Sequence, residues 1–203
     1  MMLSMLNPEY RFSSLEKITP EWLDRHQYRV LLLDIDNTLL PRSSSVVPDC
    51  HLHWLQQLQE QGIAVVLASN NGGQRVAAIK KQLSAKGLRI PILTWAGKPL
   101  PRAYAGAFRL LEKCFPEVAV AVAKESDHIQ DSETAKRSGC VLAAGDQLFT
   151  DVLGAHWINL PVAWLRPLSQ HDFIGTKILR ILETWVTGYL TKQNLLPEED
   201  KGT

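Results

Sequence analysis

VLLLDIDNTLL, residues 30–40, is the stretch from which the fold can be inferred. Its first four residues are aliphatic without polar alternation, which is typical of a strand buried on both faces in a parallel sheet. Asp34 and Asp36 follow, and burying unpaired carboxylates costs too much free energy for core positions. We therefore expect both at the carboxyl edge of the sheet, where open α/β folds bind their ligands. The alternative is a strand followed by a solvated turn, because Asp and Asn favour turns.

The composition is ordinary for a soluble globular protein. The chain has 203 residues, 45% of them hydrophobic and 21% charged, which suits one domain with a sizeable core. The net charge is only +1 and the sequence has no basic stripe, so we expect no nucleic-acid partner. The opening MMLSML is too short for a signal peptide, and no run approaches the ~20 apolar residues of a membrane span. We expect a cytoplasmic protein, with peripheral contact at the inner face of a membrane left open.

Cysteine and histidine placement argues against a disulfide framework or a zinc site. The three cysteines, Cys50, Cys114 and Cys140, are odd in number and form no CxxC pair, which favours a reducing cytosol. The histidines show no ligand spacing with Cys or Glu, so we expect surface or packing roles for them. Among them are His51, His53, His128, His156 and His171.

Strands and helices alternate after an N-terminal arm, residues 1–28, whose one helix is capped by Thr19 with Pro20 at its first position. Strands are predicted over 30–33, 63–68, 90–94, 118–123, 140–144 and 161–165. Helices are predicted over 49–61, 74–86, 102–114, 128–138 and 176–190. This alternation predicts βαβ units in a single α/β domain, 1–203, with a disordered acidic tail at 197–203.

Polar residues follow the predicted strands. They are Asp34 and Asp36, then Ser69 and Asn70, then Lys98 at a helix start, then Asp146 and Asp151. In a parallel sheet these positions converge on one edge. Three converging carboxylates need a cation, and all-oxygen ligation suits Mg²⁺. A lysine, a hydroxyl and a helix start suit phosphate oxygens.

This combination predicts phosphoryl transfer through a carboxylate nucleophile. Asp34 would attack phosphorus, and Asp36 would protonate the leaving alkoxide and then deprotonate the hydrolytic water. Mg²⁺ would reduce the repulsion between the nucleophile and the phosphate. Ser69 and Lys98 would hold the phosphate oxygens.

Four of the candidate site residues also have a purely structural interpretation. Ser69 and Asn70 would mark a strand-to-helix turn, and Lys98 would be an exposed surface lysine. Asp151 would be the N-cap of the following helix, which is compatible with a role in the site.

DIDNT, SNN after a strand, KP and GDQLFTD together resemble the four motifs of the haloacid-dehalogenase (HAD) superfamily phosphatases. More closely they resemble the YqeG-type group and the similar mitochondrial phosphatidylglycerophosphate phosphatases, over about residues 29–180, with VAWLRPL (162–168) and TKILRILE (176–183) as closing elements. The resemblance implies a three-layer, Rossmann-like HAD fold with a mostly parallel central sheet and no cap domain. The chain departs from the group at about 118–139, which we interpret as an inserted strand and helix.

The resemblance also implies residue roles. Asp34 is the nucleophile, Asp36 the acid/base, and Ser69 and Lys98 are the phosphate clamps. Asp146, Asp34 and the Asp36 backbone carbonyl ligate Mg²⁺, and Asp151 supports the metal site or Lys98. The substrate contacts are Thr38, Ser69, Asn70 and Lys98.

Two function classes remain open, a Mg²⁺-dependent phosphomonoesterase and a non-catalytic HAD-like binding protein. The intervals 38–69 and 69–98 are too short for a capping domain, so we expect an open site. An open site suits the headgroup of phosphatidylglycerophosphate better than the alternative, a soluble sugar phosphate or nucleotide. The amphipathic helix 176–190 would either cover the sheet or contact a membrane surface.

Overall fold

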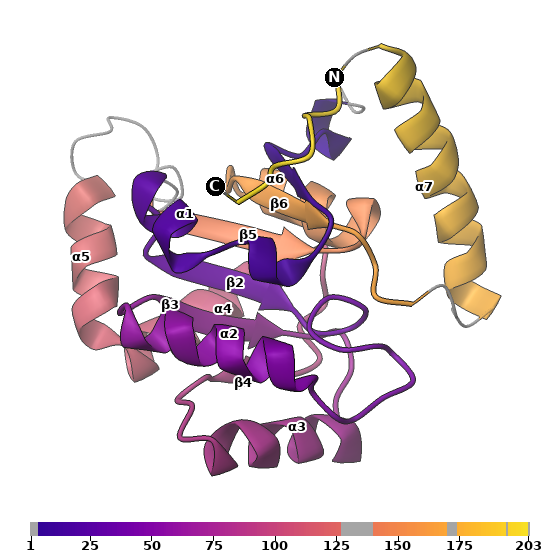
Figure 1. Cartoon of the computed structure of the whole chain (residues 1–203). Helices are drawn as coiled ribbons and strands as arrows, with labels where there is room; N and C mark the ends of the chain where they lie inside the picture. Colours follow the sequence, from indigo (N-terminus) through magenta and orange to yellow (C-terminus); the bar gives the residue numbers. More distant parts are fainter. Residues whose placement is uncertain (1–3, 127–139, 170–173, 194, 203) are drawn as a thin grey trace.

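A central parallel β-sheet lies between two layers of helices in the computed structural model of the chain (Figure 1). The structure describes residues 4–126, 140–169, 174–193 and 195–202. The sheet has six strands in the order β1-β6-β5-β2-β3-β4, and every pair is parallel. The strands are β1 (Tyr10–Phe12), β2 (Val30–Asp34), β3 (Ala64–Ala68), β4 (Ile92–Leu93), β5 (Val141–Gly145) and β6 (Val162–Leu165). The predicted fold class is confirmed.

The helices connect these strands and cover both faces of the sheet. They are α1 (Pro20–Arg25), α2 (Asp49–Glu60), α3 (Gln74–Ala85), α4 (Pro101–Cys114), α5 (Pro116–Ser126), α6 (Leu153–His156) and α7 (Ile174–Lys192). Shorter turns are the 3₁₀ helices η1 (Ser4–Leu6) and η2 (Leu15–Lys17) and the π-helical turn η4 (Leu148–Val152). Between β2 and α4 the chain forms only α2, β3, α3 and β4, so neither of the intervals 38–69 and 69–98 carries a capping domain.

The core explains why the central strands carry no polar alternation. Every residue of β2, β3 and β5 is buried. Leu31 and Leu33 face the helices α1, α2 and α3, whereas Val30 and Leu32 face α4, α5 and α7. Both faces of the sheet are thus covered, which is the condition under which a parallel strand becomes wholly apolar.

The segment 118–123 is helical, which corrects the predicted strand. It forms most of α5, and Phe115, Val118, Ala119 and Val122 pack against the core on the α4 side. Their spacing is that of one helix face, whereas Val120 is 53% exposed. The alternation of Val and Ala therefore matches the pattern of a strand, although the positions that pack against the core follow the helical period. The helix predicted over 128–138 lies outside the described residues.

Both ends of the chain pack together beside the sheet. The N-terminal arm contributes β1 as an edge strand, and Thr19 caps α1 by accepting a hydrogen bond from the backbone of Trp22 at 3.1 Å. In the described part of the tail, the Asp200 amide donates to the Arg11 carbonyl at 2.7 Å. The Trp22 indole donates to the Asp200 carboxylate at 2.9 Å. These contacts differ from the disordered tail that the acidic composition predicts, because Trp22 and the edge of β1 offer it partners.

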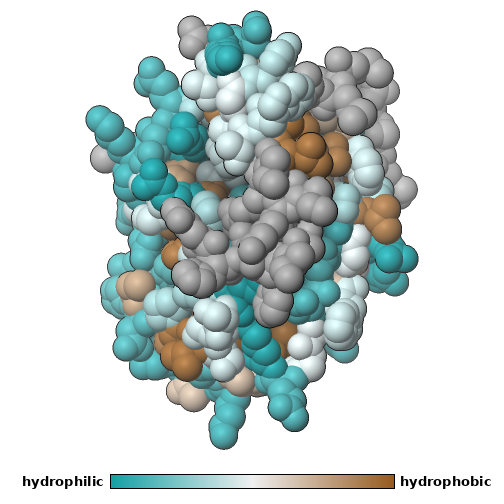
Figure 2. Space-filling model, turned by 90° about the vertical axis from the view of Figure 1, so that its right-hand side faces the viewer, coloured by the Kyte–Doolittle hydropathy of each residue, from teal (hydrophilic) through white to brown (hydrophobic). Residues whose placement is uncertain are grey.

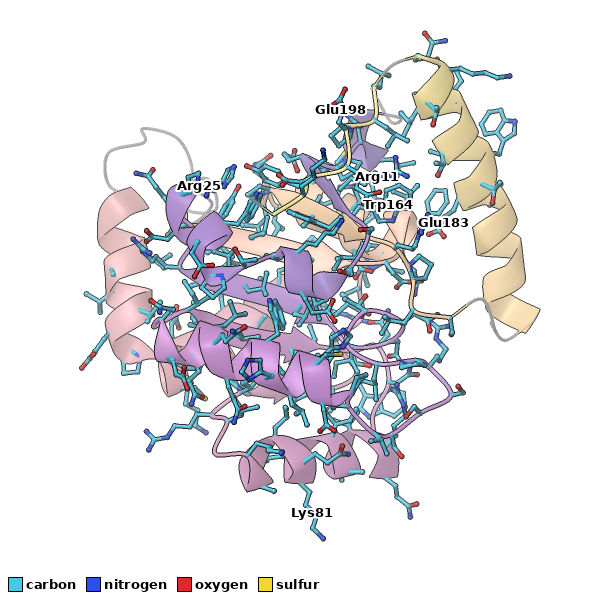
Figure 3. The ribbon with its side chains drawn as sticks, viewed as in Figure 1. Arg11, Arg25, Lys81, Trp164, Glu183 and Glu198 are labelled. Atoms are coloured by element: carbon cyan, nitrogen blue, oxygen red, sulfur yellow. The ribbon has the colours of Figure 1, made fainter. Side chains whose placement is uncertain are left out.

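Helix α7 stands at the side of the molecule where the strands point (Figure 1). Val186 and Leu190 are buried against the core, and Glu183 accepts a hydrogen bond from the Leu148 amide at 2.8 Å. Figure 3 shows Glu183 directed from α7 toward the region of Trp164. The neighbouring stripe of Leu182, Trp185 and Tyr189 is exposed. Among the helices that the structure describes, none combines the length and apolarity needed to cross a bilayer.

Candidate active site

The predicted site residues converge at the carboxyl edge of three adjacent strands. Asp34 is the last residue of β2 and pairs in register with Ala68, the last residue of β3. Ser69 follows Ala68 directly and therefore lies at the same edge of the sheet as Asp34. On the other side of β2, Leu33 pairs with Ala144 of β5, which places Asp146 just beyond that strand end. Residues more than a hundred positions apart in sequence therefore share one edge, as expected for a parallel sheet.

Lys98 joins two of the carboxylates. Its ammonium donates to Asp34 Oδ1 at 2.5 Å and to Asp151 Oδ1 at 2.7 Å, and its side chain is only 8% exposed. Burial alone would lower the pKa of Lys98, but the two carboxylates outweigh it and hold the pKa above its ordinary value. Lys98 is therefore a fixed cation within the site and not an exposed surface lysine.

Asp34 has one oxygen engaged and one free. Its Oδ2 is buried and has no hydrogen-bond partner among the described residues. Burial raises the pKa of Asp34 to about 7, against the attraction of Lys98 and with added repulsion from Asp151. An unpartnered, buried carboxylate oxygen is costly unless a ligand or cation completes it.

Three buried carboxylates form a cluster that fits a divalent cation. Asp34, Asp146 and Asp151 each offer an oxygen, and these atoms lie within 4.8 Å of one another. An all-oxygen donor set is the one that Mg²⁺ prefers. The free Oδ2 of Asp34 is an independent sign that a ligand belongs here. The residues present therefore fit the expected metal.

Asp151 is placed by a tight turn after β5. Its Oδ2 accepts a hydrogen bond from the Gln147 amide at 3.1 Å, and Tyr104 donates to its backbone carbonyl at 3.2 Å. A Cβ at position 145 would overlap the Asp151 carboxyl group, so Gly145 is required for this close approach. The predicted helix-capping role is not what the carboxylate does, because it contacts Lys98 and the turn that begins at Gln147.

Asp36 is held by three donors from the loop after β3 and from α3. Ser69 Oγ and Asn71 Nδ2 donate to its Oδ2 at 2.8 and 2.9 Å. Arg75 Nη1 donates to its Oδ1 at 2.7 Å. Arg75 also donates to the Ser44 carbonyl at 2.7 Å, which fixes the guanidinium over the loop after β2. Both oxygens of Asp36 are therefore engaged in this state.

Asn70 organises the loop that carries Lys98. Its Oδ1 accepts from the amides of Gly97 and Lys98 at 2.9 and 2.8 Å, and its Nδ2 donates to the Lys98 carbonyl at 2.9 Å. These bonds hold the Lys98 loop in place, and the substrate contact expected for Asn70 stays a prediction.

The turn after Asp36 is fixed by Asn37. Asn37 adopts φ = 64°, a left-handed conformation that Asn tolerates better than most residues, and its amide donates to the Leu40 carbonyl at 2.9 Å. Thr38 lies in this turn, and its buried Oγ1 has no hydrogen-bond partner among the described residues. Thr38 therefore retains a free hydroxyl at the predicted substrate position.

Sequence reasoning missed Asn71, Arg75, Tyr104 and Trp164. Trp164 donates from its indole to the Asp146 carbonyl at 2.9 Å, and the other three contact Asp36 or Asp151 as described above. For Arg75 a signal existed: it is the first cation after the SNNGG loop, in the first turn of the helix that begins there. The contacts of Tyr104 and Trp164 depend on packing between distant elements and leave no local pattern.

The chain is similar to known proteins in sequence and in structure. Residues 2–167 match the sequence profile of a family described as "Mitochondrial PGP phosphatase". The chain is 26% identical over 200 residues to the "Probable phosphatase YqeG" of Bacillus subtilis (strain 168), covering 98% of this chain and 100% of that relative. A crystal structure of a haloacid dehalogenase-like hydrolase from Brucella suis 1330 aligns with a TM-score of 0.40 and 14% identity, over 75% of this chain and 98% of that one.

Proposed function

Because this chain belongs to the mitochondrial PGP phosphatase family and is a HAD-type phosphatase, we propose that it hydrolyses phosphatidylglycerophosphate to phosphatidylglycerol by a Mg²⁺-dependent aspartyl-phosphate mechanism. The observation that carries the mechanism is the state of Asp34. One of its oxygens is held by Lys98, and the other is buried and unpartnered. A carboxylate so fixed, with one free oxygen, is suited to nucleophilic attack.

In the first step Asp34 would attack phosphorus, and the bond from phosphorus to the lipid alkoxide would break. The phosphoryl group would then be carried on the Asp34 carboxylate, and the leaving alkoxide would take a proton from Asp36. In the second step Asp36 would take a proton from water, and the water oxygen would displace Asp34 from phosphorus. Lys98 would hold the phosphate oxygens throughout, with its own position set by Asp151.

Asp36 must be released before it can act as an acid, because Ser69, Asn71 and Arg75 occupy both of its oxygens. A substrate phosphate is a stronger attractor for a guanidinium and a hydroxyl than a single carboxylate, since it carries more charge and more acceptor oxygens. We infer that the incoming phosphate draws donors away from Asp36. Substrate binding and activation of the acid would thereby be coupled.

Asp34 and Asp146 would hold Mg²⁺, with Asp151 as a third ligand or as the partner of Lys98. The cation would supply positive charge that reduces the repulsion between the carboxylates and the phosphate. The raised pKa of Asp34 without a cation is consistent with this need, because burial and Asp151 both disfavour its ionised form.

The lipid substrate is supported by what surrounds the site. No capping domain lies between β2 and α4, so a small ester would find no enclosure there. On the face that the strands point toward, apolar side chains reach the surface in separate patches (Figure 2). The exposed Leu182, Trp185 and Tyr189 stripe of α7 carries two aromatic residues, a type suited to the membrane–water interface.

The test compares specificity constants for phosphatidylglycerophosphate in vesicles and for soluble sugar phosphates and nucleotides, with Mg²⁺ and with chelator. We expect the lipid to be preferred and the activity to vanish in chelator. A soluble ester preferred by a hundredfold, about 2.7 kcal/mol of transition-state free energy, would exclude the lipid assignment.

Asp34→Asn should lose activity by at least about a thousandfold, whereas the exposed control Asp49→Asn should not. Acid-stable phosphate that labels Asp34→Asn as strongly as the native chain would exclude Asp34 as the nucleophile.

A further inference from the structure

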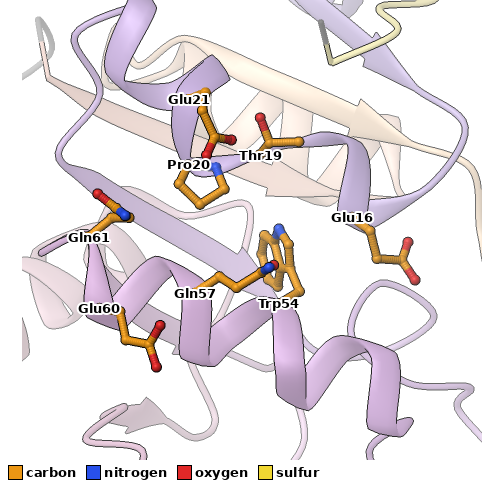
Figure 4. A pocket seen from close by; sticks show the side chains of 8 residues that line it. All are labelled: Glu16, Thr19, Pro20, Glu21, Trp54, Gln57, Glu60 and Gln61. Carbon is orange, nitrogen blue, oxygen red and sulfur yellow. The ribbon is translucent and has the colours of Figure 1, made fainter.

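Three residues with metal-binding side chains meet away from the carboxylate cluster. Glu16 lies in η2 of the N-terminal arm, and Cys50 and His51 lie in the first turn of α2. One ligand atom from each lies within 4.8 Å of the others. Figure 4 shows Glu16 on the arm segment that faces α2, at the border of a hollow of about 300 Å³. Glu16 and Cys50 are 34 residues apart in sequence, so no short sequence motif predicts this cluster.

His51 is oriented as a metal-binding histidine. It is 3% exposed, and its Nδ1 lies 2.5 Å from the Leu39 carbonyl oxygen, which can only accept. Nδ1 therefore carries the proton, and Nε2 is the free nitrogen of the neutral ring. A backbone carbonyl on one ring nitrogen, with the other nitrogen directed at the ligand cluster, is the usual arrangement around protein-bound metals.

The contact between His51 and Glu16 needs a positive charge between or on the partners. His51 Nε2 lies 3.2 Å from Glu16 Oε1, and in the neutral ring both atoms are acceptors. Either a proton or a metal ion resolves this contact. Two ligands about 2.0 Å from a tetrahedral metal are separated by about 3.3 Å, which matches the observed distance.

We propose that Glu16, Cys50 and His51 form a second metal site, for Zn²⁺ or a similar first-row transition-metal ion. The donor set of one nitrogen, one sulfur and one oxygen is typical of such ions and is disfavoured by Mg²⁺. Cys50 is exposed, so a fourth position is open to water. The all-oxygen cluster of Asp34, Asp146 and Asp151 suits the harder ion, and the two sites thus differ in ligand chemistry.

This site would join the N-terminal arm to α2 and to the catalytic loop. Trp54 Nε1 already donates to the Ile18 carbonyl at 2.8 Å, one helical turn along α2. Leu39, whose carbonyl contacts His51, follows Thr38 in the loop after β2, which also carries Asp36. A bound metal would fix the position of this loop from behind, without contact to substrate.

The test uses Co²⁺ as a spectroscopic substitute, added to the full chain in a thiol-free reductant with Mg²⁺ saturating the carboxylate site. We expect a thiolate-to-cobalt charge-transfer band and the visible bands of a tetrahedral ion, at one equivalent. Both should disappear when Zn²⁺ is added. Cys50→Ser should abolish the charge-transfer band, whereas Cys114→Ser, also at an exposed cysteine, should retain it. A native chain without the band, or a Cys50→Ser variant that keeps it, would show that the cluster is only an ion pair.

A second measurement covers the oxygen ligand and the link to folding. Zn²⁺ should raise the melting temperature of the native chain, because an ion that binds only to the folded state stabilises that state. Glu16→Gln should weaken Zn²⁺ binding about tenfold in calorimetry, and the Zn²⁺-induced rise in its melting temperature, measured from its own metal-free value, should be smaller than that of the native chain. Equal Zn²⁺ affinity in Glu16→Gln and in the native chain would remove Glu16 from the site and overturn the three-ligand proposal.

Discussion

At the scale of single residues, the site is organised by shared partners. Lys98 contacts Asp34 and Asp151, whereas Ser69, Asn71 and Arg75 contact Asp36. The two neighbouring carboxylates of the DIDNT segment are thus held by two separate groups of donors. This separation allows Asp34 to stay fixed while Asp36 changes partners.

Arg75→Ala should lower kcat by about ten- to a hundredfold, because the Asp36 carboxylate and the substrate phosphate both lose a charged donor. Arg75→Lys should restore only part of the rate, since a single ammonium cannot bridge Asp36 and the Ser44 carbonyl as the guanidinium does. The measurement is steady-state kinetics on a soluble aryl phosphate. Lys81→Ala, at the exposed side of the same helix (Figure 3), is the control, and an equal loss there would remove any specific role for Arg75.

The sequence predicts that Asp34, Ser69, Lys98 and Asp146 lie at one edge of the sheet. Each of them stands at or after the end of a predicted strand, and the ends of parallel strands lie at the same edge. It does not predict that Asn70 holds the Lys98 loop or that Arg75 reaches Asp36. Those contacts depend on the rotation of α3 and on the path of two loops, which residue types alone do not determine. The cluster of Glu16 with Cys50 and His51 was missed for the same reason.

At the scale of elements, α5 shows how a local pattern can mislead. The sequence VAVAVA satisfies a strand alternation, and β-branched residues favour strands. Pro116 at the start and the adjoining face of α4 instead favour a helix that buries Val122 and packs the partly buried Val118 and Ala119 against the core. Packing against α4 decides the outcome, because only the helical period places these three side chains on one side.

Val122→Ala should lower the free energy of unfolding by about 1–3 kcal/mol, because it removes two methyl groups from a buried position. Val120→Ala, two residues earlier and exposed, should change it by less than about 0.5 kcal/mol. Urea denaturation of the two variants provides the comparison. Similar losses at both positions would contradict the helical assignment.

The contact between Glu9 and His156 should make stability depend on pH. His156 Nε2 lies 3.1 Å from Glu9 Oε2. Partial burial of His156 opposes its ionisation, but the hydrogen bonds to Glu9 and to the Met5 carbonyl outweigh burial and raise the pKa of His156 above 6.5. Burial likewise opposes ionisation of Glu9, yet the bonds to His156 and to the Val162 amide lower its pKa below 4.5. The His156 contribution is therefore complete below pH 6.5 and is lost as pH rises through its raised pKa. The Glu9 contribution is complete above pH 4.5 and is lost as pH falls through its lowered pKa.

Glu9→Gln should accordingly destabilise the protein most between about pH 4.5 and 6.5, and less at alkaline pH. The measurement is the free energy of unfolding of both chains across this range. A destabilisation that is constant with pH would mean that the ion pair contributes nothing and that only the bond to Val162 matters.

At the scale of the whole molecule, the site and the exposed stripe of α7 lie toward the same side. Glu183 connects them, since it reaches from α7 to the Leu148 amide in η4, the turn that contains Asp151. Trp185 is 68% exposed and stacks with Tyr189 at 6.4 Å. If the proposed lipid substrate is correct, this helix, with its buried stripe on η4 and its neighbouring stripe aromatic, would bring the site to the lipid surface.

Replacing both Trp185 and Tyr189 by Ala should raise the apparent KM for phosphatidylglycerophosphate in vesicles about tenfold, because interfacial contact scales with the apolar area that is buried. Turnover of a soluble aryl phosphate should be unchanged. Trp157→Ala, at an exposed tryptophan beyond α6, is the control. If the double variant loses both activities equally, α7 supports the fold and not the approach to a membrane.

The position of β1 has a consequence for how the protein is made. As the ribosome extends the chain, residues 10–12 emerge early, yet their partner strand β6 follows about 150 residues later. The nascent chain can pair β2 with β3, and β3 with β4, before β5 is made, and it then holds Asp34, Ser69 and Lys98 without Asp146 and Asp151. Lys98 would at that stage have one of its two carboxylate partners. Phosphatase activity should therefore arise only after β5 and the turn beyond it have left the ribosome, and the edge of β1 stays uncovered until the residues around Asp200 arrive.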